Sequence, residues 1–334
     1  MKITILTRDF KKINDVDTYG RENINDALDI KKALEDVHEV KISPATEETY
    51  LELKNEKPDL VFNLGDDGFR GDPTLEPHVA AIFDILNIPY TGNNYFSLAL
   101  CQNKARAKEI LSYQGIPTPK FQVFTNANRK LNPELKFPLI VKPVREDGSV
   151  GIKERSVVNN EEQLREQVNH VLDVYQQEAL VEEFIDGREF NLALLGNKKL
   201  TALPIAEVDF SGMPSNMPRI VSYRAKWVKQ SVAFKKTPVI CPAQIDEKLT
   251  NLIQETAKKC FKAFACHGYS RIDFRYDDKN NQIYVLEVNP NPDISADAGM
   301  ARAALAAGLS YKDLLLKIID LAIDRAKSAS PKPA

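Results

Sequence analysis

Two acidic residues and an asparagine near the end of the chain have the types and spacing of a metal site. Residues 269–276 and 282–292 alternate as strands do and are joined by polar turn residues, which predicts a β-hairpin. One face of this hairpin carries Asp273, Glu287 and Asn289, with Asp273 expected diagonal to Glu287 at roughly 7–8 Å. Two carboxylates and an amide oxygen suit a hard cation such as Mg²⁺.

The same alternation allows a plainer interpretation of the hairpin. Arg271 and Arg275 share the face of the acids, so the acids could simply pair with them on a solvated surface. The opposite face is predicted to pack into the core through Ile272, Phe274, Tyr276, Tyr284, Leu286 and Val288. The hairpin alone does not choose between a metal site and a solvated face.

A lysine and a glycine-rich segment in the middle of the chain have the composition of a phosphate site. Lys142 lies in the apolar strand predicted for residues 138–143, and residues 145–151 place two glycines around Ser149. Such a segment brings backbone N–H groups close to phosphate oxygens, while the lysine supplies a positive charge. A hairpin turn with an incidental lysine fits the same residues.

The elements that position these residues begin with strands alternating with helices. This order predicts a small doubly wound domain with a parallel sheet at the N-terminus. Its predicted strands are residues 3–6, 39–42, 59–63 and 89–91, and its predicted helices are residues 25–37 and 75–86. Ligands of such sheets bind beyond the carboxyl ends of the strands, where the glycine-rich residues 65–71 would lie. A ligand-binding loop and a plain turn are both compatible with that segment.

Further elements are predicted between this domain and the hairpin. Residues 97–114 predict one helix with Lys104 and Lys108 on the same face. Residues 179–185 predict a strand whose hairpin partner is residues 188–195, across a turn at Asp186-Gly187. A strand at 121–124 and helices at 160–174, 246–265, 300–307 and 311–326 complete the predicted elements.

Composition bounds the class of protein. Of the 334 residues 43% are hydrophobic and 28% charged, and the net charge of −2 gives no basic field for nucleic acid or an anionic membrane. The four cysteines lack CxxC spacing, which favours reduced thiols, with Cys260 and Cys266 in the core. No segment approaches the ~20 apolar residues of a membrane helix, and the N-terminus lacks the apolar length of a signal peptide. We expect a soluble cytoplasmic protein.

In their order along the chain, these motifs resemble the ATP-grasp superfamily, and most closely the D-alanine–D-alanine ligase family. The resemblance extends over roughly residues 1 to 325, and its motifs are weak singly but specific when all stand in register. They are Lys104 with Lys108, residues 140–143 with 148–151, and residues 181–185, 187–189, 225–226, 241–243, 271–273 and 286–289.

The resemblance implies an α/β protein with an ATP-grasp fold, in which two α+β lobes grip ATP between antiparallel sheets after the doubly wound domain. The implied division is an N-terminal domain at 1–95, a central lobe with the phosphate loop at 96–186, and a C-terminal lobe with the metal site at 187–326. Residues 327–334 are expected to form a frayed tail.

The resemblance also assigns roles to residues. Contacts to ATP fall to Lys104, Lys142, Gly148, Ser149, Val150, Gly151, Glu182, Glu183, Phe184, Ile185, Glu189 and Lys226. Asp273, Glu287 and Asn289 match the ligands of two Mg²⁺ ions, with Mn²⁺ as a possible substitute. Arg271 matches the arginine that stabilises the oxyanion, and Lys226 and Ser149 complete the implied catalytic set.

On the substrate side, the sequence departs from the family pattern. Asp66 stands about where the family carries a histidine-glycine motif, residues 292–294 replace a glycine-methionine corner, and Ala298-Gly299 replaces a serine-leucine pair. Substrate candidates are Glu22, Asp293 and Asp297 for an ammonium or polar amine, and Arg145, Arg219, Arg224 or Arg302 for a carboxylate. Simple surface exposure is the alternative explanation for these residues.

The predicted function is that of an ATP-dependent ligase joining a small carboxylate to a small amine through an acyl phosphate, with ADP and phosphate as products. The retained ATP motifs and altered substrate motifs predict that the substrates are not two D-alanines. An ATP-grasp small-molecule kinase and a nucleotide-binding regulatory module are the alternatives. Expected partners are the two amino-acid-like substrates, without nucleic acid or membrane, and the resemblance implies a homodimer.

Overall fold

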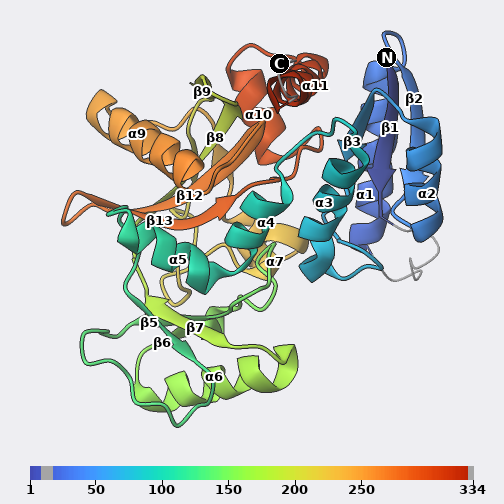
Figure 1. Ribbon diagram of the computed structural model, residues 1–334. Coiled ribbons are helices and arrows are strands. Elements are labelled where there is room, and N and C mark those ends of the chain that lie inside the picture. Colours follow the sequence, from blue (N-terminus) through green and yellow to red (C-terminus); the bar gives the residue numbers. More distant parts are fainter. Residues whose placement is uncertain (9–17, 330–334) are drawn as a thin grey trace.

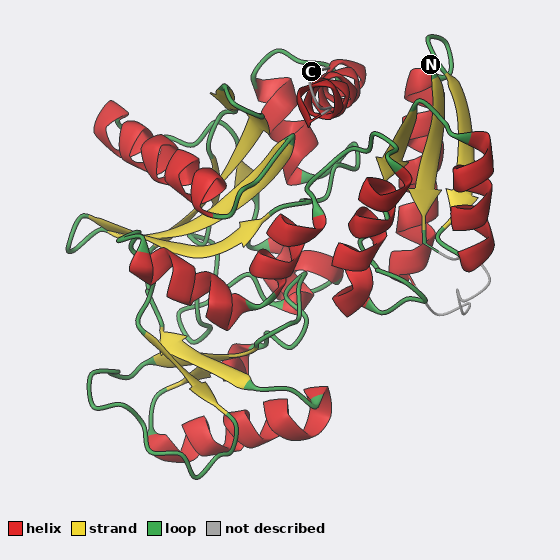
Figure 2. Cartoon of the chain, viewed as in Figure 1, coloured by secondary structure: helices red, strands yellow, loops and turns green. Residues whose placement is uncertain are grey.

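The computed structural model describes residues 1–8 and 18–329, of which residues 18–23 and 329 are described only as backbone. The described residues form three β-sheets, each with helices packed against it (Figures 1 and 2). None of the helices in this described part is both long enough and apolar enough to span a bilayer.

The N-terminal sheet is parallel, with strand order β2-β1-β3, as predicted from the alternation of strands and helices. Its strands are β1 (Lys2–Thr7), β2 (Glu39–Pro44) and β3 (Leu60–Asn63), and its helices are α1 (Thr18–Leu34), α2 (Glu47–Glu56) and α3 (Glu76–Leu86). The strand predicted at 89–91 is only a parallel bridge between Val61 and Tyr90. Helix α2 was not predicted; Thr46 caps it by accepting a hydrogen bond from the Thr49 amide at 3.3 Å.

The second sheet is antiparallel, with strand order β4-β7-β5-β6. Its strands are β4 (Phe121–Phe124), β5 (Leu139–Pro143), β6 (Val157–Val158) and β7 (Ala179–Glu183). Helix α6 (Glu161–Tyr175) covers one face, burying Leu164, Val168 and Val171 against the apolar residues of these strands. This leaves Lys142 of β5 and Glu182 of β7 on the other face.

The third sheet contains the predicted β12–β13 hairpin. Its strand order is β11-β10-β8-β12-β13, and β9 pairs with β8 outside this path. The strands are β8 (Arg188–Gly196), β9 (Leu200–Ala202), β10 (Ala206–Val208), β11 (Val239–Ile240), β12 (Tyr269–Asp277) and β13 (Gln282–Asn289). Helix α9 (Glu247–Ala263) packs on it, and Cys260 and Cys266 are buried in this core, as predicted.

The predicted pairing of residues 179–185 with 188–195 is wrong. Strand β7 pairs with β4 and β5, whereas β8 pairs with strands of the third sheet, so Asp186 and Gly187 connect two sheets. A Cβ atom at Gly187 would lie 1.9 Å from the Tyr276 carbonyl oxygen, so this crossing requires glycine. The Asp-Gly pattern marked a sharp change of direction, but long-range strand pairing decided what it connects.

The single helix predicted for residues 97–114 is also wrong, because two helices occupy this segment. Helix α4 (Tyr95–Gln102) ends at Asn103, which has an extended backbone and whose side chain accepts a hydrogen bond from the Arg106 amide at 3.1 Å. Asn103 therefore caps α5 (Lys104–Tyr113). The break lets the Lys104 amide donate to the Val144 carbonyl at 3.0 Å, which places the first residue of α5 beside the end of β5.

A bulge in β13 changes the predicted faces of the hairpin. Asp273 pairs with Glu287 and Phe274 pairs with Val285, so Leu286 is an extra residue between them. Ile283 and Val285, rather than Tyr284 and Leu286, are therefore buried with Ile272, Phe274 and Val288. Asp273 lies directly opposite Glu287, not diagonal to it.

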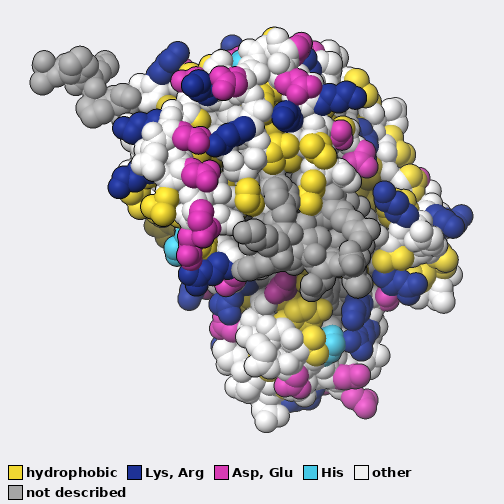
Figure 3. All heavy atoms as spheres, turned by 90° about the vertical axis from the view of Figure 1, so that its right-hand side faces the viewer, with side chains coloured by type: hydrophobic (Ala, Val, Ile, Leu, Met, Phe, Trp, Pro, Cys, Tyr) yellow, Lys and Arg dark blue, Asp and Glu magenta, His cyan; other side chains and the backbone are white. Residues whose placement is uncertain are grey.

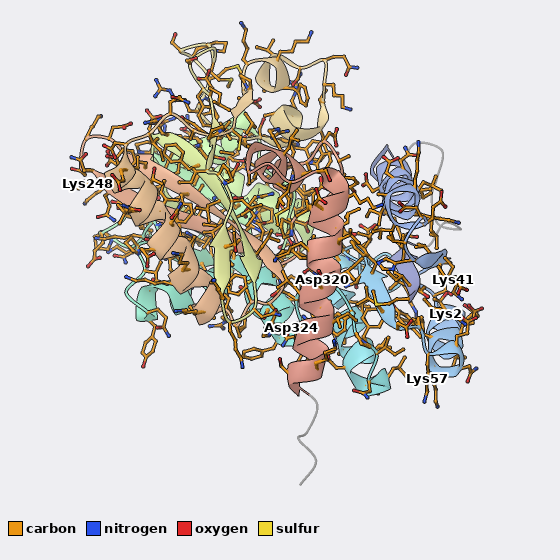
Figure 4. All side chains as sticks on the ribbon, turned by 90° about the horizontal axis from the view of Figure 1, so that it is seen from above. Lys2, Lys41, Lys57, Lys248, Asp320 and Asp324 are labelled. Carbon is orange, nitrogen blue, oxygen red and sulfur yellow. The ribbon has the colours of Figure 1, made fainter. Side chains whose placement is uncertain are left out.

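The C-terminal helices join the third sheet to the N-terminal sheet. Helix α10 (Gly299–Ala306) and helix α11 (Tyr311–Ala329) share one hydrophobic core with Ile3, Phe62 and Tyr269. Seen from above, α11 with Asp320 and Asp324 runs between the α9 side, marked by Lys248, and the strands of Lys2 and Lys41 (Figure 4). Because α11 extends to Ala329, the tail predicted at 327–334 begins too early; its last five residues lie outside the described part.

Two short helices precede β11. They are α7 (Tyr223–Trp227) and α8 (Val232–Lys235), capped by the side chains of Ser222 and Ser231. Single turns of 3-10 helix lie at 73–75 and 154–156. Over the described part of the face in Figure 3, Lys and Arg side chains are interspersed with Asp and Glu, so charges of one sign do not gather there.

Candidate active site

The β12–β13 hairpin brings the predicted metal ligands together. Arg271 donates from Nε and Nη2 to the two carboxylate oxygens of Asp273, each at 2.8 Å. The Asn289 amide nitrogen donates to Asp273 Oδ2 at 3.1 Å and to the Arg271 carbonyl at 3.3 Å, so its amide oxygen remains for a cation. Asn191 of β8 donates to Asp273 Oδ1 at 3.2 Å and was not predicted. The charged face thus has a specific arrangement, not that of a loosely solvated surface.

The residue types suit a hard cation, which would displace one of the donors now on Asp273, because each of its carboxylate oxygens accepts two hydrogen bonds. Glu287, directly across the ladder from Asp273, supplies a second carboxylate. Burial raises the pKa of Glu287, but the positive charges of Lys104, Arg271 and Lys142 outweigh this effect and lower the pKa to about 2. In the part of the chain that the structure describes, no group of three or more His, Cys, Asp or Glu side chains lies close enough together to hold a metal ion. A cation between Asp273 and Glu287 would therefore also need the amide oxygen of Asn289.

Lys104 connects this hairpin to the predicted phosphate loop. Its Nζ lies 2.9 Å from Asp147 Oδ1 and 3.8 Å from Glu287 Oε2, and it also donates to the Glu146 carbonyl. The ammonium group at the start of α5 therefore stands between a loop acid and a predicted metal ligand. A phosphate chain lying between loop and hairpin would meet this charge.

Glu182 is at the centre of a second charged group. Its carboxylate is 1% exposed and pairs with Lys142 from β5 and with Lys108 from α5, the latter at 2.7 Å. Burial raises the pKa of Glu182, and the two lysines together lower it below its usual range. Lys108 was placed beside Lys104 by their spacing of four, but it was not assigned to the site.

Residues 183–185, which were predicted to contact adenine, follow Glu182. The Phe184 amide donates to the Pro138 carbonyl at 3.1 Å, and the Lys120 amide donates to a Glu183 carboxylate oxygen at 3.3 Å. Ile185 is half-buried. These contacts tie Glu183 and Phe184 to the two neighbouring segments, so the chain leaves β7 in a fixed position beside Glu182.

Glu189 has an unexpected partner in Arg275. Arg275 Nη2 lies 2.8 Å from Glu189 Oε2, and Arg275 also donates to the Gly187 and Arg219 carbonyls. Its guanidinium lies over the Phe210 ring, 5.0 Å from the centroid. Burial raises the pKa of Glu189, while Arg275 opposes that effect. Arg275 had been noted only as a residue on the hairpin face, because its partners come from other strands.

The predicted phosphate loop is joined to the segment that carries Lys226. Ser149 Oγ donates to the Val221 carbonyl at 2.9 Å, and Trp227 Nε1 donates to the Gly148 carbonyl at 2.8 Å. Gly148, Ser149 and Gly151 all have positive φ angles, so the chain turns tightly here. Burial lowers the pKa of Lys226, and the nearby Arg271 lowers it further. Val150 lies within the same turn, its amide donating to the Asp147 carbonyl at 3.0 Å.

The predicted substrate residues are less well gathered. Asp293 and Asp297 are exposed, and Asp293 Oδ1 accepts hydrogen bonds from the Ser295 amide and hydroxyl at 2.9 and 2.6 Å. Glu22 lies in α1, but its side chain is outside the described residues. The arginine candidates for a carboxylate are three exposed side chains, Arg145, Arg219 and Arg224, and the half-buried Arg302. The geometry does not choose among them.

Three residues that were not assigned to the site link the end of the hairpin to the N-terminal part. Asn291 Nδ2 donates to Glu76 Oε1 at 3.0 Å, and Asn291 Oδ1 accepts from the Asn93 amide at 2.8 Å. Burial and the nearby Asp66 raise the pKa of Glu76 well above its usual value. The repeated Asn-Pro of residues 289–292 was the only signal in the sequence, and it did not indicate the partner.

A comparison with known protein families shows which family this chain belongs to. A family described as the C-terminal part of D-alanine–D-alanine ligases matches residues 110–320. The chain belongs to the D-alanine–D-alanine ligase family. An annotated D-alanine–D-alanine ligase of Carboxydothermus hydrogenoformans is 32% identical over 285 residues, covering 81% of this chain and 84% of its own. An uncharacterized protein of Sinorhizobium fredii is 35% identical over 263 residues, covering 79% of this chain and 74% of that protein.

The structural comparison agrees on the fold. The ATP complex of a D-alanine–D-alanine ligase from Bacillus anthracis has a TM-score of 0.76 at 24% identity, covering 99% of this chain and all of the other. As a member of this ATP-grasp ligase family, the protein is an ATP-dependent ligase. The predicted resemblance, fold class and enzyme class are thereby confirmed.

Proposed function

We propose that the protein joins a small carboxylate to a small amine at the β12–β13 hairpin, using ATP and Mg²⁺. The observation that carries this proposal is the ladder pair of Asp273 and Glu287 with Arg271 bound to Asp273 at 2.8 Å. A carboxylate oxygen of the first substrate attacks the γ-phosphorus of ATP and ADP leaves. The amine then attacks the resulting acyl phosphate, and phosphate leaves with formation of the amide bond.

The chain's own residues supply binding, charge and water exclusion in this proposal. Lys104 and Lys142 neutralise the triphosphate, and Arg271 stabilises the negative charge that develops on the acyl oxygen. Asp273, Glu287 and Asn289 would hold Mg²⁺, which would neutralise phosphate charge when bound. The loop at 148–151 and the segment carrying Lys226 and Trp227 exclude water, which would otherwise hydrolyse the acyl phosphate.

The departures from the family pattern at Asp66, residues 292–294 and Ala298-Gly299 are what support a pair other than two D-alanines. Glu76 and Asp66 lie at the junction of α3 and the segment after Asn289, and Asp293 follows in that segment. Burial and the nearby Asp66 raise the pKa of Glu76 and so favour its neutral form, which leaves the exposed Asp293 and Asp297 as the acids available to a cationic or polar amine. The annotated relatives are D-alanine–D-alanine ligases, so a D-alanine pair is the reference against which other pairs are compared.

The test is phosphate release from ATP and Mg²⁺ across a panel of amino acids and carboxylates, supplied singly and in pairs. We expect turnover only when a carboxylate and an amine are both present, and a coupled product by mass spectrometry. Turnover with one acceptor and a stable phosphorylated product would identify a kinase. Nucleotide binding without turnover in any pair would favour a regulatory module, and efficient coupling of D-alanine alone would overturn the substrate proposal.

The domain division and the homodimer belong to the same proposal. Each of the three described sheets falls within one predicted range, at 1–95, 96–186 and 187–326, which supports the proposed boundaries. The homodimer rests on family resemblance, and light scattering in solution tests it. A monomer at micromolar concentration would contradict it.

A further inference from the structure

Glu182 is paired with two lysines that differ in their surroundings. Lys108 comes from α5 and is only 2% exposed, whereas Lys142 comes from β5 and is 16% exposed. Lys108 Nζ lies 2.7 Å from Glu182 Oε2 and donates to Thr118 Oγ1 at 2.8 Å. Lys108 is therefore enclosed by protein groups, while Lys142 is the more exposed of the two lysines and so the one that a bound triphosphate would reach.

Lys142 cannot hold the Glu182 carboxylate and bind a triphosphate at full strength at the same time. A lysine ammonium that moves to a phosphate leaves its former carboxylate partner behind. A buried carboxylate without a positive partner is strongly unfavourable, because it has lost its hydration. Unless another cation remains on Glu182, Lys142 would stay on that carboxylate.

Within the described residues, Lys108 is the other cation within ion-pair distance of Glu182. Lys104 is committed elsewhere, since its Nζ bonds to Asp147 and the Glu146 carbonyl. We propose that Lys108 is a positioning residue that keeps Glu182 charge-paired and in place, and thereby frees Lys142 to bind the triphosphate. This inference rests on the proposed roles of Glu182 at the adenine and of Lys142 at the phosphates.

The hydrogen bonds of Lys108 also connect the adenine side to the metal side. Thr118 Oγ1, which accepts from Lys108, donates to the Val285 carbonyl at 2.8 Å, and the Val285 amide donates to the Pro117 carbonyl at 2.8 Å. Val285 immediately precedes Leu286, the bulge residue, and then Glu287. Lys108 is thus held against the strand of a proposed metal ligand, and these hydrogen bonds would keep it in place if Lys142 moved to a phosphate.

The test compares ATP with adenosine, which lacks phosphates, by calorimetric binding to the full-length protein. In Lys108→Met, Lys142 should stay on Glu182, so ATP affinity should fall about tenfold or more while adenosine affinity changes less than about threefold. Lys108→Arg should restore most of the ATP affinity. Arg106→Met is the matched control, since Arg106 is an exposed cation of the same helix whose pair is Glu109. An equal loss of ATP and adenosine in Lys108→Met would mean a merely structural role and overturn the inference.

The Glu182→Gln background keeps the inference falsifiable if Lys108→Met folds poorly. Glu182→Gln removes the negative charge that attracts Lys142, so Lys142 is free to bind phosphate whether or not Lys108 is present. In that background Lys108→Met should therefore no longer weaken ATP binding relative to adenosine binding. The same loss in both backgrounds would overturn the inference. Lys142→Met tests the proposed phosphate contact of Lys142 apart from the role of Lys108. If this variant leaves ATP affinity unchanged, Lys142 does not bind the phosphates and the proposed function fails at that point. If it weakens ATP but Lys108→Met does not, only the inference about Lys108 fails.

Discussion

Asp273 on β12 lies directly opposite Glu287 on β13, because Leu286 is the extra residue of a bulge between Val285 and Glu287. The bulge keeps Val285 in the core and still turns Glu287 toward the charged face. Two carboxylates on neighbouring strands repel each other unless cations compensate them, and Arg271 and Lys104 do so here. A bound cation would share this role.

Glu287→Gln should abolish metal-dependent turnover, because it removes a charged oxygen ligand and retains the shape of the side chain. We expect kcat to fall about a hundredfold or more, with a higher Mg²⁺ concentration for half-maximal activity. Steady-state rates over a Mg²⁺ titration measure both quantities. Asp278→Asn, at an exposed acid of the hairpin turn, is the control. A fully active Glu287→Gln enzyme would refute the metal assignment.

Gly151→Ala should raise the KM for ATP. Gly151 has a φ of +80°, and a Cβ there would lie 2.6 Å from Pro143 Cγ, in a ring that cannot swing away. We expect the loop to shift, with a loss of about 2–3 kcal/mol in the free energy of unfolding. Gly115→Ala is the matched control: its φ is +65° with no atom within 4 Å, so it should lose only about 1 kcal/mol and keep its KM. Equal KM values for both variants would argue against a nucleotide contact at 148–151.

Trp227 should report nucleotide binding by fluorescence. It is the single tryptophan of the sequence, and its indole N–H donates to the Gly148 carbonyl at 2.8 Å. Nucleotide bound at the phosphate loop should change the environment of the indole ring, so titration with ATP should shift the emission. The dissociation constant from this titration should equal the one measured by calorimetry. Trp227→Phe provides the blank. Saturating ATP with Mg²⁺ and no spectral change would place the nucleotide away from this loop.

Lys226 should limit activity at alkaline pH. Burial and Arg271 lower the pKa of Lys226 from the usual 10.5, so its positive charge, present below the pKa, is lost as the pH rises through that lowered value. The profile of kcat/KM, which reports the free enzyme, should fall on its alkaline side below pH 10.5. In Lys226→Arg the positive charge persists to higher pH, so the alkaline fall of kcat/KM should occur at a higher pH. If the alkaline fall of kcat/KM stayed at the same pH, it would belong to a group other than Lys226.

Patterns in the sequence were sufficient to predict those elements of the fold that depend on residues close together in the chain. The alternation of strands and helices predicted the parallel N-terminal sheet, and alternating residues predicted β12 and β13. The spacing of Lys104 and Lys108 put both ammonium groups on one side of a helix. Glycines at 148 and 151 marked positive φ angles that other residues adopt less easily.

Only the tertiary structure decided how these pieces meet. The Asp186-Gly187 turn has the same local chemistry whether it joins paired strands or, as here, two sheets. The bulge at Leu286 lets Val285 be buried while Glu287 lies opposite Asp273, and local periodicity shows neither of these long-range relationships. The pairing of Lys108 with Glu182, of Arg275 with Glu189 and of Asn291 with Glu76 joins residues far apart in the chain. Charge type and spacing determine which residues can do chemistry, but the packing of distant strands and helices determines which charges share a buried site.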